Sequence, residues 1–117
     1  MDVLESLLRQ IAAVHTSALV TGDRKRNGQV LHSRWKIGEF LSSADKNAKI
    51  SRKFGSDWMR QLSLRLREQL GKGFALSNLY AMRNLYLEYR LSDLSDALSW
   101  NHYKILMNIA NLDLRLR

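Results

Sequence analysis

The segment GKGFALSNLYAMRNLY, residues 71–86, decides how this chain folds. Its apolar residues after the second glycine recur at steps of three and four, which predicts a helix over residues 76–90. The preceding segment SDWMRQLSLRLREQL, residues 56–70, has the same helical spacing and ends directly before Gly71. Because a glycine with positive φ commonly ends a helix, we expect two helices joined by a turn at Gly71.

The same glycines permit a second interpretation, in which GKG holds a phosphate. A P-loop requires the pattern G-x-x-x-x-G-K-[ST] after a buried strand, and a dinucleotide loop requires G-x-G-x-x-G in a βαβ unit. Gly71 and Gly73 supply only G-x-G, with no third glycine, and they follow a predicted helix. The sequence therefore favours an inter-helix turn, in which Gly73 lets the chain reverse.

The rest of the chain is also helical in its periodicity. It contains no proline and only six glycines, so long helices meet few breakers. No segment alternates as a β-strand does, and the polar residues 43–55 form a connector or a short helix. We predict an all-α protein, a compact bundle of about five helices in a single domain (1–117), whose third and fourth helices form a helix-turn-helix-like pair. The other helices are expected over residues 1–22 (amphipathic), 24–43 and 100–112, the last capped by Ser99.

Composition limits the classes of function. The absence of cysteine excludes disulfides and thiolate metal sites, and three widely separated histidines predict no metal centre and no cofactor. No apolar run approaches the ~18 residues needed to span a bilayer, and the N-terminus lacks a basic signal region, so we expect a cytoplasmic protein with no membrane partner. The net charge of +8 points to a polyanion, most often nucleic acid, although it also serves simple solubility.

The positive charge gathers in the middle of the chain, where residues 46–72 hold eight Lys and Arg against Asp57 and Glu68. In a helix-turn-helix the second helix enters the major groove of DNA by its N-terminal part, while nearby cations contact phosphates. The alternative is that the turn only joins two packed helices and binds nothing. The predicted phosphate contacts are Arg52, Lys53, Arg60, Arg67 and Lys72, and the second-helix residues expected at the DNA are Ser77, Asn78, Tyr80, Arg83 and Asn84.

No group of residues has the pattern of an active site. The sequence contains no Ser-His-Asp set, no nucleophile elbow and no paired carboxylates with a lysine. His102 is expected to act as a capping or hydrogen-bonding residue, and the three tryptophans are expected in the core. We therefore predict that this chain is not an enzyme.

Four segments carry a recognisable set of motifs. They are RWKIGE (34–39), FGSDWMRQLSLRL (54–66), GKGFALSNLYAM (71–82) and LSWNHY (98–103). The set resembles the N-terminal domain of the YhcG-type bacterial protein family, which has a tyrosine-tryptophan-x-isoleucine-glycine box, a glycine followed by L-S-x-x-L, and G-x-G-F-S-x-x-N-L-x-x-M and L-S-W-x-H boxes. The resemblance covers roughly residues 27–117.

The resemblance implies a helix-turn-helix or winged-helix-like DNA-binding module that precedes a PD-(D/E)xK-type nuclease domain in longer relatives. No nuclease motif follows in this chain, so the nuclease domain is absent and cleavage is not implied. Ala75 replaces the family serine that would cap the fourth helix, so this helix either lacks a side-chain cap or begins later, at Ser77. Arg34 replaces the family tyrosine. The motif positions carried over are Asn78, Leu79, Met82, Trp100 and His102.

A rival hypothesis is an assembly module without direct DNA contact. The amphipathic N-terminal helix would pack against a second copy and form a homodimer. Leu64, which lies off the apolar stripe of the third helix, is a second candidate contact.

Overall fold

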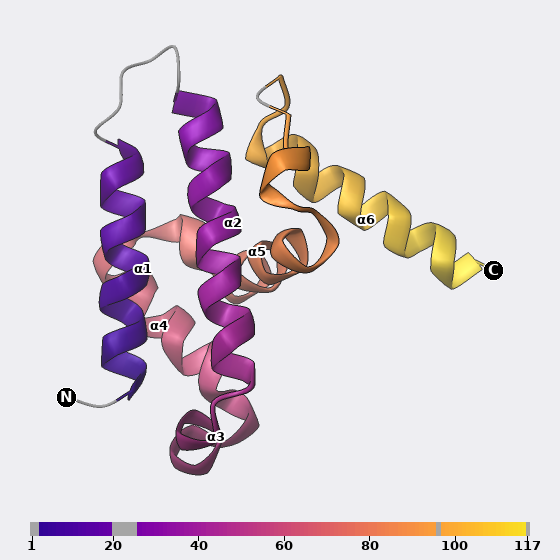
Figure 1. The fold of residues 1–117 in the computed structure, drawn as a ribbon. Helices are drawn as coiled ribbons and strands as arrows, with labels where there is room; N and C mark the ends of the chain where they lie inside the picture. Colours follow the sequence, from indigo (N-terminus) through magenta and orange to yellow (C-terminus); the bar gives the residue numbers. More distant parts are fainter. Residues whose placement is uncertain (1–2, 20–25, 96, 117) are drawn as a thin grey trace.

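The computed structural model describes residues 3–19, 26–95 and 97–116, and within these ranges it contains helices and no strand (Figure 1). The all-α prediction is confirmed, with five helices of 13 to 20 residues and one short helix of 7. The helices are α1 (Val3–Leu19), α2 (Arg26–Asp45), α3 (Ala48–Phe54), α4 (Trp58–Leu70), α5 (Leu76–Glu88) and α6 (Trp100–Leu116), and 3-10 turns span Gly55–Asp57, Lys72–Phe74 and Leu91–Asp93.

The N-terminal helices α1 and α2 lie side by side and antiparallel (Figure 1). The apolar stripe of α1 packs against α2 and α4. Its buried residues are Leu4, Leu7, Leu8 and Ile11. These four residues are therefore used inside the bundle, whereas Val14 of the same stripe is half-buried.

Helices α2 and α5 approach each other closely at Gly38 of α2. A Cβ atom placed on Gly38 would lie 2.0 Å from the carbonyl oxygen of Met82 and 2.8 Å from its carbonyl carbon. The backbones of α2 and α5 therefore touch, and α5 packs more extensively on α2 than on any other helix. Ile37 and Leu41 of α2 and Leu79 of α5 are completely buried in the same core.

The turn between α4 and α5 depends on one glycine and one buried aromatic residue. Gly71 has a φ of 96°, as expected for a glycine that ends a helix, and its N–H donates to the carbonyl of Arg67. Phe74 is buried, and its carbonyl accepts a hydrogen bond from the hydroxyl of Ser63 at 2.8 Å. Gly73 lies inside the 3-10 turn in which the chain reverses, and its φ is not positive.

The boundaries of α5 differ from the prediction at its C-terminal end. The helix begins at Leu76 after Ala75, which makes no side-chain cap, so the expected loss of the family serine's cap is confirmed and Ser77 does not replace it. It ends at Glu88, two residues early, because Tyr89 turns to an extended conformation. The carbonyl of Tyr89 accepts from Nε1 of Trp35 at 2.9 Å, and its ring packs edge-on against Tyr103.

The start of α6 is fixed by a reciprocal cap. The hydroxyl of Ser99 accepts from the backbone N–H of His102, and Nδ1 of His102 accepts from the backbone N–H of Ser99 at 3.0 Å. The predicted capping roles of both residues are thus confirmed. Trp100, Tyr103 and Met107 anchor the first half of α6 in the core, whereas its second half extends away from the other helices (Figure 1).

Candidate nucleic-acid interface

The short helix α3 occupies the polar segment that follows α2. The side chain of Asn47 caps it by accepting from the backbone N–H of Lys49 at 2.9 Å. Ile50 is 2% exposed and holds the helix against the core. Gly55 ends α3 with a φ of 65°. The sequence predicted either a connector or a short helix for residues 43–55. The cap at Asn47 and the buried Ile50 stabilise the helix.

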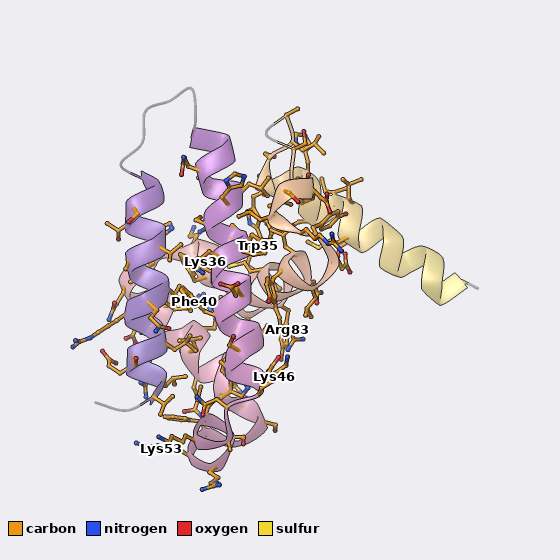
Figure 2. The ribbon with its side chains drawn as sticks, viewed as in Figure 1. Trp35, Lys36, Phe40, Lys46, Lys53 and Arg83 are labelled. Carbon is orange, nitrogen blue, oxygen red and sulfur yellow. The ribbon has the colours of Figure 1, made fainter. Side chains whose placement is uncertain are left out.

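Four cations project from this part of the molecule. They are Lys46, Lys49, Arg52 and Lys53, which we call the α3 basic face, and all four are exposed. Figure 2 shows Lys46 and Lys53 flanking α3 at its end of the molecule. None of the four forms an ion pair with a described carboxylate, although Lys53 lies over the ring of Phe54. Arg52 and Lys53 were predicted, and the structure adds Lys46 and Lys49.

The predicted cations of α4 lie on another exposed strip. Arg60 and Arg67 share this side of α4 with Leu64, which is 53% exposed. Lys72 is exposed in the following 3-10 turn. These three cations thus belong to α4 and the turn after it, and not to α3.

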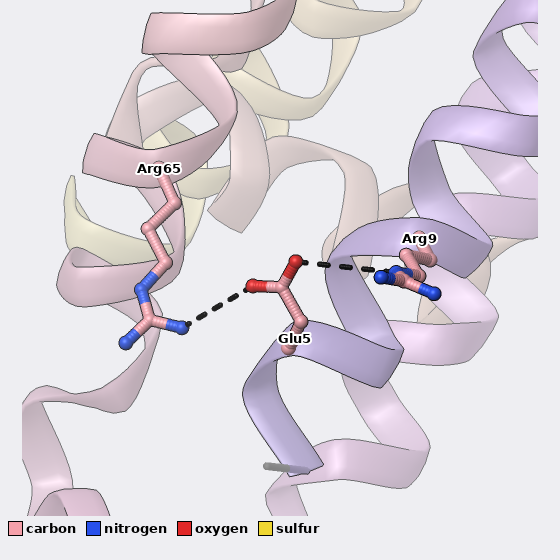
Figure 3. A network of polar contacts seen from close by, with 3 residues as sticks. All are labelled: Glu5, Arg9 and Arg65. Carbon is pink, nitrogen blue, oxygen red and sulfur yellow. Dashed lines mark ion pairs between the residues drawn. The ribbon is translucent and has the colours of Figure 1, made fainter. Parts of the chain in front are cut away.

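Arg65, the remaining cation of α4, faces α1. One oxygen of the Glu5 carboxylate lies 3.8 Å from Nη1 of Arg65, and the other lies 4.0 Å from Nε of Arg9 (Figure 3). Glu5 therefore offsets positive charge at the junction of α1 and α4. Arg65 contributes to helix packing, which distinguishes it from Arg60 and Arg67.

The five predicted residues of α5 separate into three groups. Tyr80 is 41% exposed, while Ser77 and the half-buried Asn84 lie toward α6 and make no side-chain hydrogen bond to a described residue. Asn78 faces α6 and accepts from Nζ of Lys104 at 3.2 Å. Arg83 faces α2 and donates from Nη1 to Oδ2 of Asp45 at 2.7 Å. Only the first group is free of a side-chain hydrogen bond within the described residues.

The ion pair of Arg83 brings α5 next to the α3 basic face. Asp45 is the last residue of α2 and Lys46 follows it directly, so Arg83 and Lys46 lie close together (Figure 2). The guanidinium of Arg83 also lies 5.0 Å from the ring centre of Tyr80. A surface of cations and one exposed aromatic ring therefore runs from α3 to the middle of α5.

A groove of about 440 Å³ separates α5 from α6. It was not predicted, because its second wall comes from α6, where the sequence shows only an amphipathic pattern. Asn101, Lys104 and Asn108 form that wall. The spacing of these three residues along one helix face was the only sequence feature that could have indicated the groove.

Residues 8–116 match the family model described as the DUF1016 N-terminal domain. The chain belongs to this family. The family is the N-terminal domain of the YhcG-like proteins, so the resemblance seen in the sequence is confirmed for this DUF1016 domain. No curated protein and no solved structure matches the chain.

The described part of the DUF1016 domain has no group of three His, Cys, Asp or Glu residues placed to hold a metal ion. Among its described helices, none combines the length and the apolar character needed to cross a membrane.

The DUF1016 domain contains one unusual buried charge, at the position where the family pattern has tyrosine. Arg34 is 8% exposed, and no described carboxylate pairs with it. Its Nη1 lies 3.2 Å from Nδ1 of His15, its guanidinium lies 5.1 Å from the ring centre of Phe74, and its Nε has no hydrogen-bond partner. Burial lowers the pKa of Arg34. Because a guanidinium only donates, Nδ1 of His15 accepts and His15 is neutral in this contact.

This contact makes stability depend on pH. Burial, and then the positive charge of Arg34, lower the pKa of His15 below its ordinary value. Between the folded-state pKa and the unfolded-state pKa of about 6.5, the unfolded chain binds more protons, so stability rises with pH. Acidification from about pH 7.5 to about pH 5 should therefore lower the free energy of unfolding.

The variant His15→Gln isolates this effect, because glutamine keeps a hydrogen-bond acceptor for Arg34 but does not titrate. Urea unfolding of both proteins across that pH range should give a shallower loss of stability for the variant. Two parallel profiles would show that His15 does not carry the pH dependence.

Proposed function

We propose that this domain binds duplex DNA through the α3 basic face, with α5 beside it. The observation that carries the proposal is the set of four exposed cations on and before α3, none of them paired with a described carboxylate. Unpaired cations release counterions from DNA when they contact phosphates, which supplies affinity without sequence preference. Arg52 and Lys53 also lie in the last turn of α3, where the helix dipole favours cations, so part of their role is structural.

The pair α4–α5 supports a helix-turn-helix-like mode. Ser77, Tyr80 and Asn84 of α5 make no side-chain hydrogen bond within the described residues, and their hydroxyl and amide groups suit phosphate and base contacts. Asn78 and Arg83 would have to exchange their contacts with Lys104 and Asp45 to reach DNA. In longer members of the YhcG-like family, such a module would deliver a C-terminal nuclease to its target.

A salt titration on duplex DNA tests the proposal. With roughly 5–8 phosphate contacts, the logarithm of the association constant should fall by about 0.9 per contact with the logarithm of salt concentration. Fluorescence anisotropy at several salt concentrations measures this slope. Binding that is absent, or that is weak and insensitive to salt, would remove the proposal.

The second candidate is an assembly module. Leu64 favours it, because this leucine is 53% exposed and stands between the charged residues of α4. Leu4, Leu7, Leu8 and Ile11 of α1 are buried in the bundle, so a contact through the N-terminal helix would use its other residues. Light scattering separates the hypotheses, since a stable dimer without DNA affinity would support assembly alone.

A further inference from the structure

The groove between α5 and α6 is lined by an unusual set of side chains. Ser77, Asn78 and Asn84 line it from α5, and Asn101, Lys104 and Asn108 line it from α6. Ala81 and the buried Met107 supply apolar surface between these polar walls. The lining residues include no carboxylate, and one of them carries a positive charge.

Three of the four asparagines have unused hydrogen-bonding capacity. Asn78 accepts from Lys104, but no side-chain hydrogen bond involves Asn84, Asn101 or Asn108 within the described part of the chain. An asparagine amide presents an NH2 donor group beside a carbonyl acceptor in a single plane. Amides on two facing helices can therefore hold a flat ligand that also presents a donor beside an acceptor.

A nucleobase is such a ligand. Asparagine pairs bidentately with adenine by accepting from the N6 amino group and donating to N7. The volume of about 440 Å³ lies within the range of small-ligand sites. A concave groove cannot reach an edge recessed inside a duplex, but it can receive a base that has left the stack. Because no carboxylate lines the groove, the backbone phosphates on either side of that nucleotide can approach it without repulsion from a like charge.

We propose that the α5–α6 groove binds an unpaired adenine base in a nucleic acid. This inference rests on the proposed DNA binding and adds a preferred structural target to it. The α3 basic face holds the duplex phosphates, and the groove accepts an adenine that protrudes from the duplex. Asn84 and Asn108 contact the base edge from opposite walls, and Lys104 stays near its phosphate.

The test compares three short duplexes of the same sequence. One is fully paired, one has a single bulged adenine, and one has 7-deazaadenine in the bulge, which lacks the N7 acceptor. The wild-type domain should bind the adenine bulge about tenfold more tightly than either of the others, as expected for one bidentate contact. The variants Asn84→Ala and Asn108→Ala should bind all three duplexes alike.

A matched variant controls for the loss of an exposed amide. Gln69 is exposed on α4 and does not line the groove, so Gln69→Ala should keep the preference for the adenine bulge. Circular dichroism checks that each variant is folded. Equal wild-type affinity for the three duplexes, with a normal salt slope, would overturn this inference and leave the proposed function intact. No binding to any duplex would overturn both.

Discussion

Replacing Gly38 by alanine is expected to lower the free energy of unfolding by about 3 kcal/mol or more, at the upper end of the cost of overpacking. The new Cβ would lie 2.0 Å from a backbone oxygen of α5, and a backbone atom cannot move aside as a flexible side chain does. α2 and α5 would have to separate along the most extensive helix contact of the domain. The helix propensity of alanine would return only about 1 kcal/mol.

Thermal and urea unfolding measure this effect, and the melting temperature should fall by more than about 10 °C. Gly73→Ala is the matched control, because a Cβ on Gly73 would meet only Nη2 of Arg34, at an ordinary 3.8 Å. That variant should unfold within about 1 kcal/mol of the wild type. Equal stability of Gly38→Ala and wild type would contradict the close approach of α2 and α5.

Neutralising the α3 basic face should nearly abolish DNA binding. The triple variant Lys49→Gln, Arg52→Gln and Lys53→Gln removes three phosphate contacts, so the salt slope should fall by about 2.7. At ~0.1 M salt this corresponds to a loss of affinity on the order of 10²–10³-fold. The three side chains are exposed, and the buried Ile50 that anchors α3 is retained, so the fold should persist.

A second triple variant separates position from total charge. Arg9→Gln, Lys36→Gln and Arg90→Gln also lowers the net charge from +8 by three, but these residues lie on α1, on α2 and after α5. It should retain most of the affinity and most of the salt slope. If both triple variants lose affinity equally, the α3 basic face is not the binding surface, and binding reflects only the net charge.

Part of the candidate site could be predicted from the sequence. Arg52 and Lys53 could be placed on the surface because runs of charged residues rarely enter a core. The roles of Asn78 and Arg83 could not be predicted, because their partners Lys104 and Asp45 lie 26 and 38 residues away along the chain. Helical periodicity distinguishes an inward from an outward side, but it does not reveal which neighbour occupies the flank of a helix.

The sequence by itself determined the features that depend on contacts within a few residues. These include the helical segments, the end of α4 at Gly71, the missing cap at Ala75 and the reciprocal cap of Ser99 and His102, because hydrogen bonds between near neighbours form wherever the chain allows them. Only the tertiary structure decided the contact at Gly38, the burial of Arg34 beside His15 and the α5–α6 groove. These features arise where side chains of separate helices pack together, and the packing of the whole core sets which helices meet.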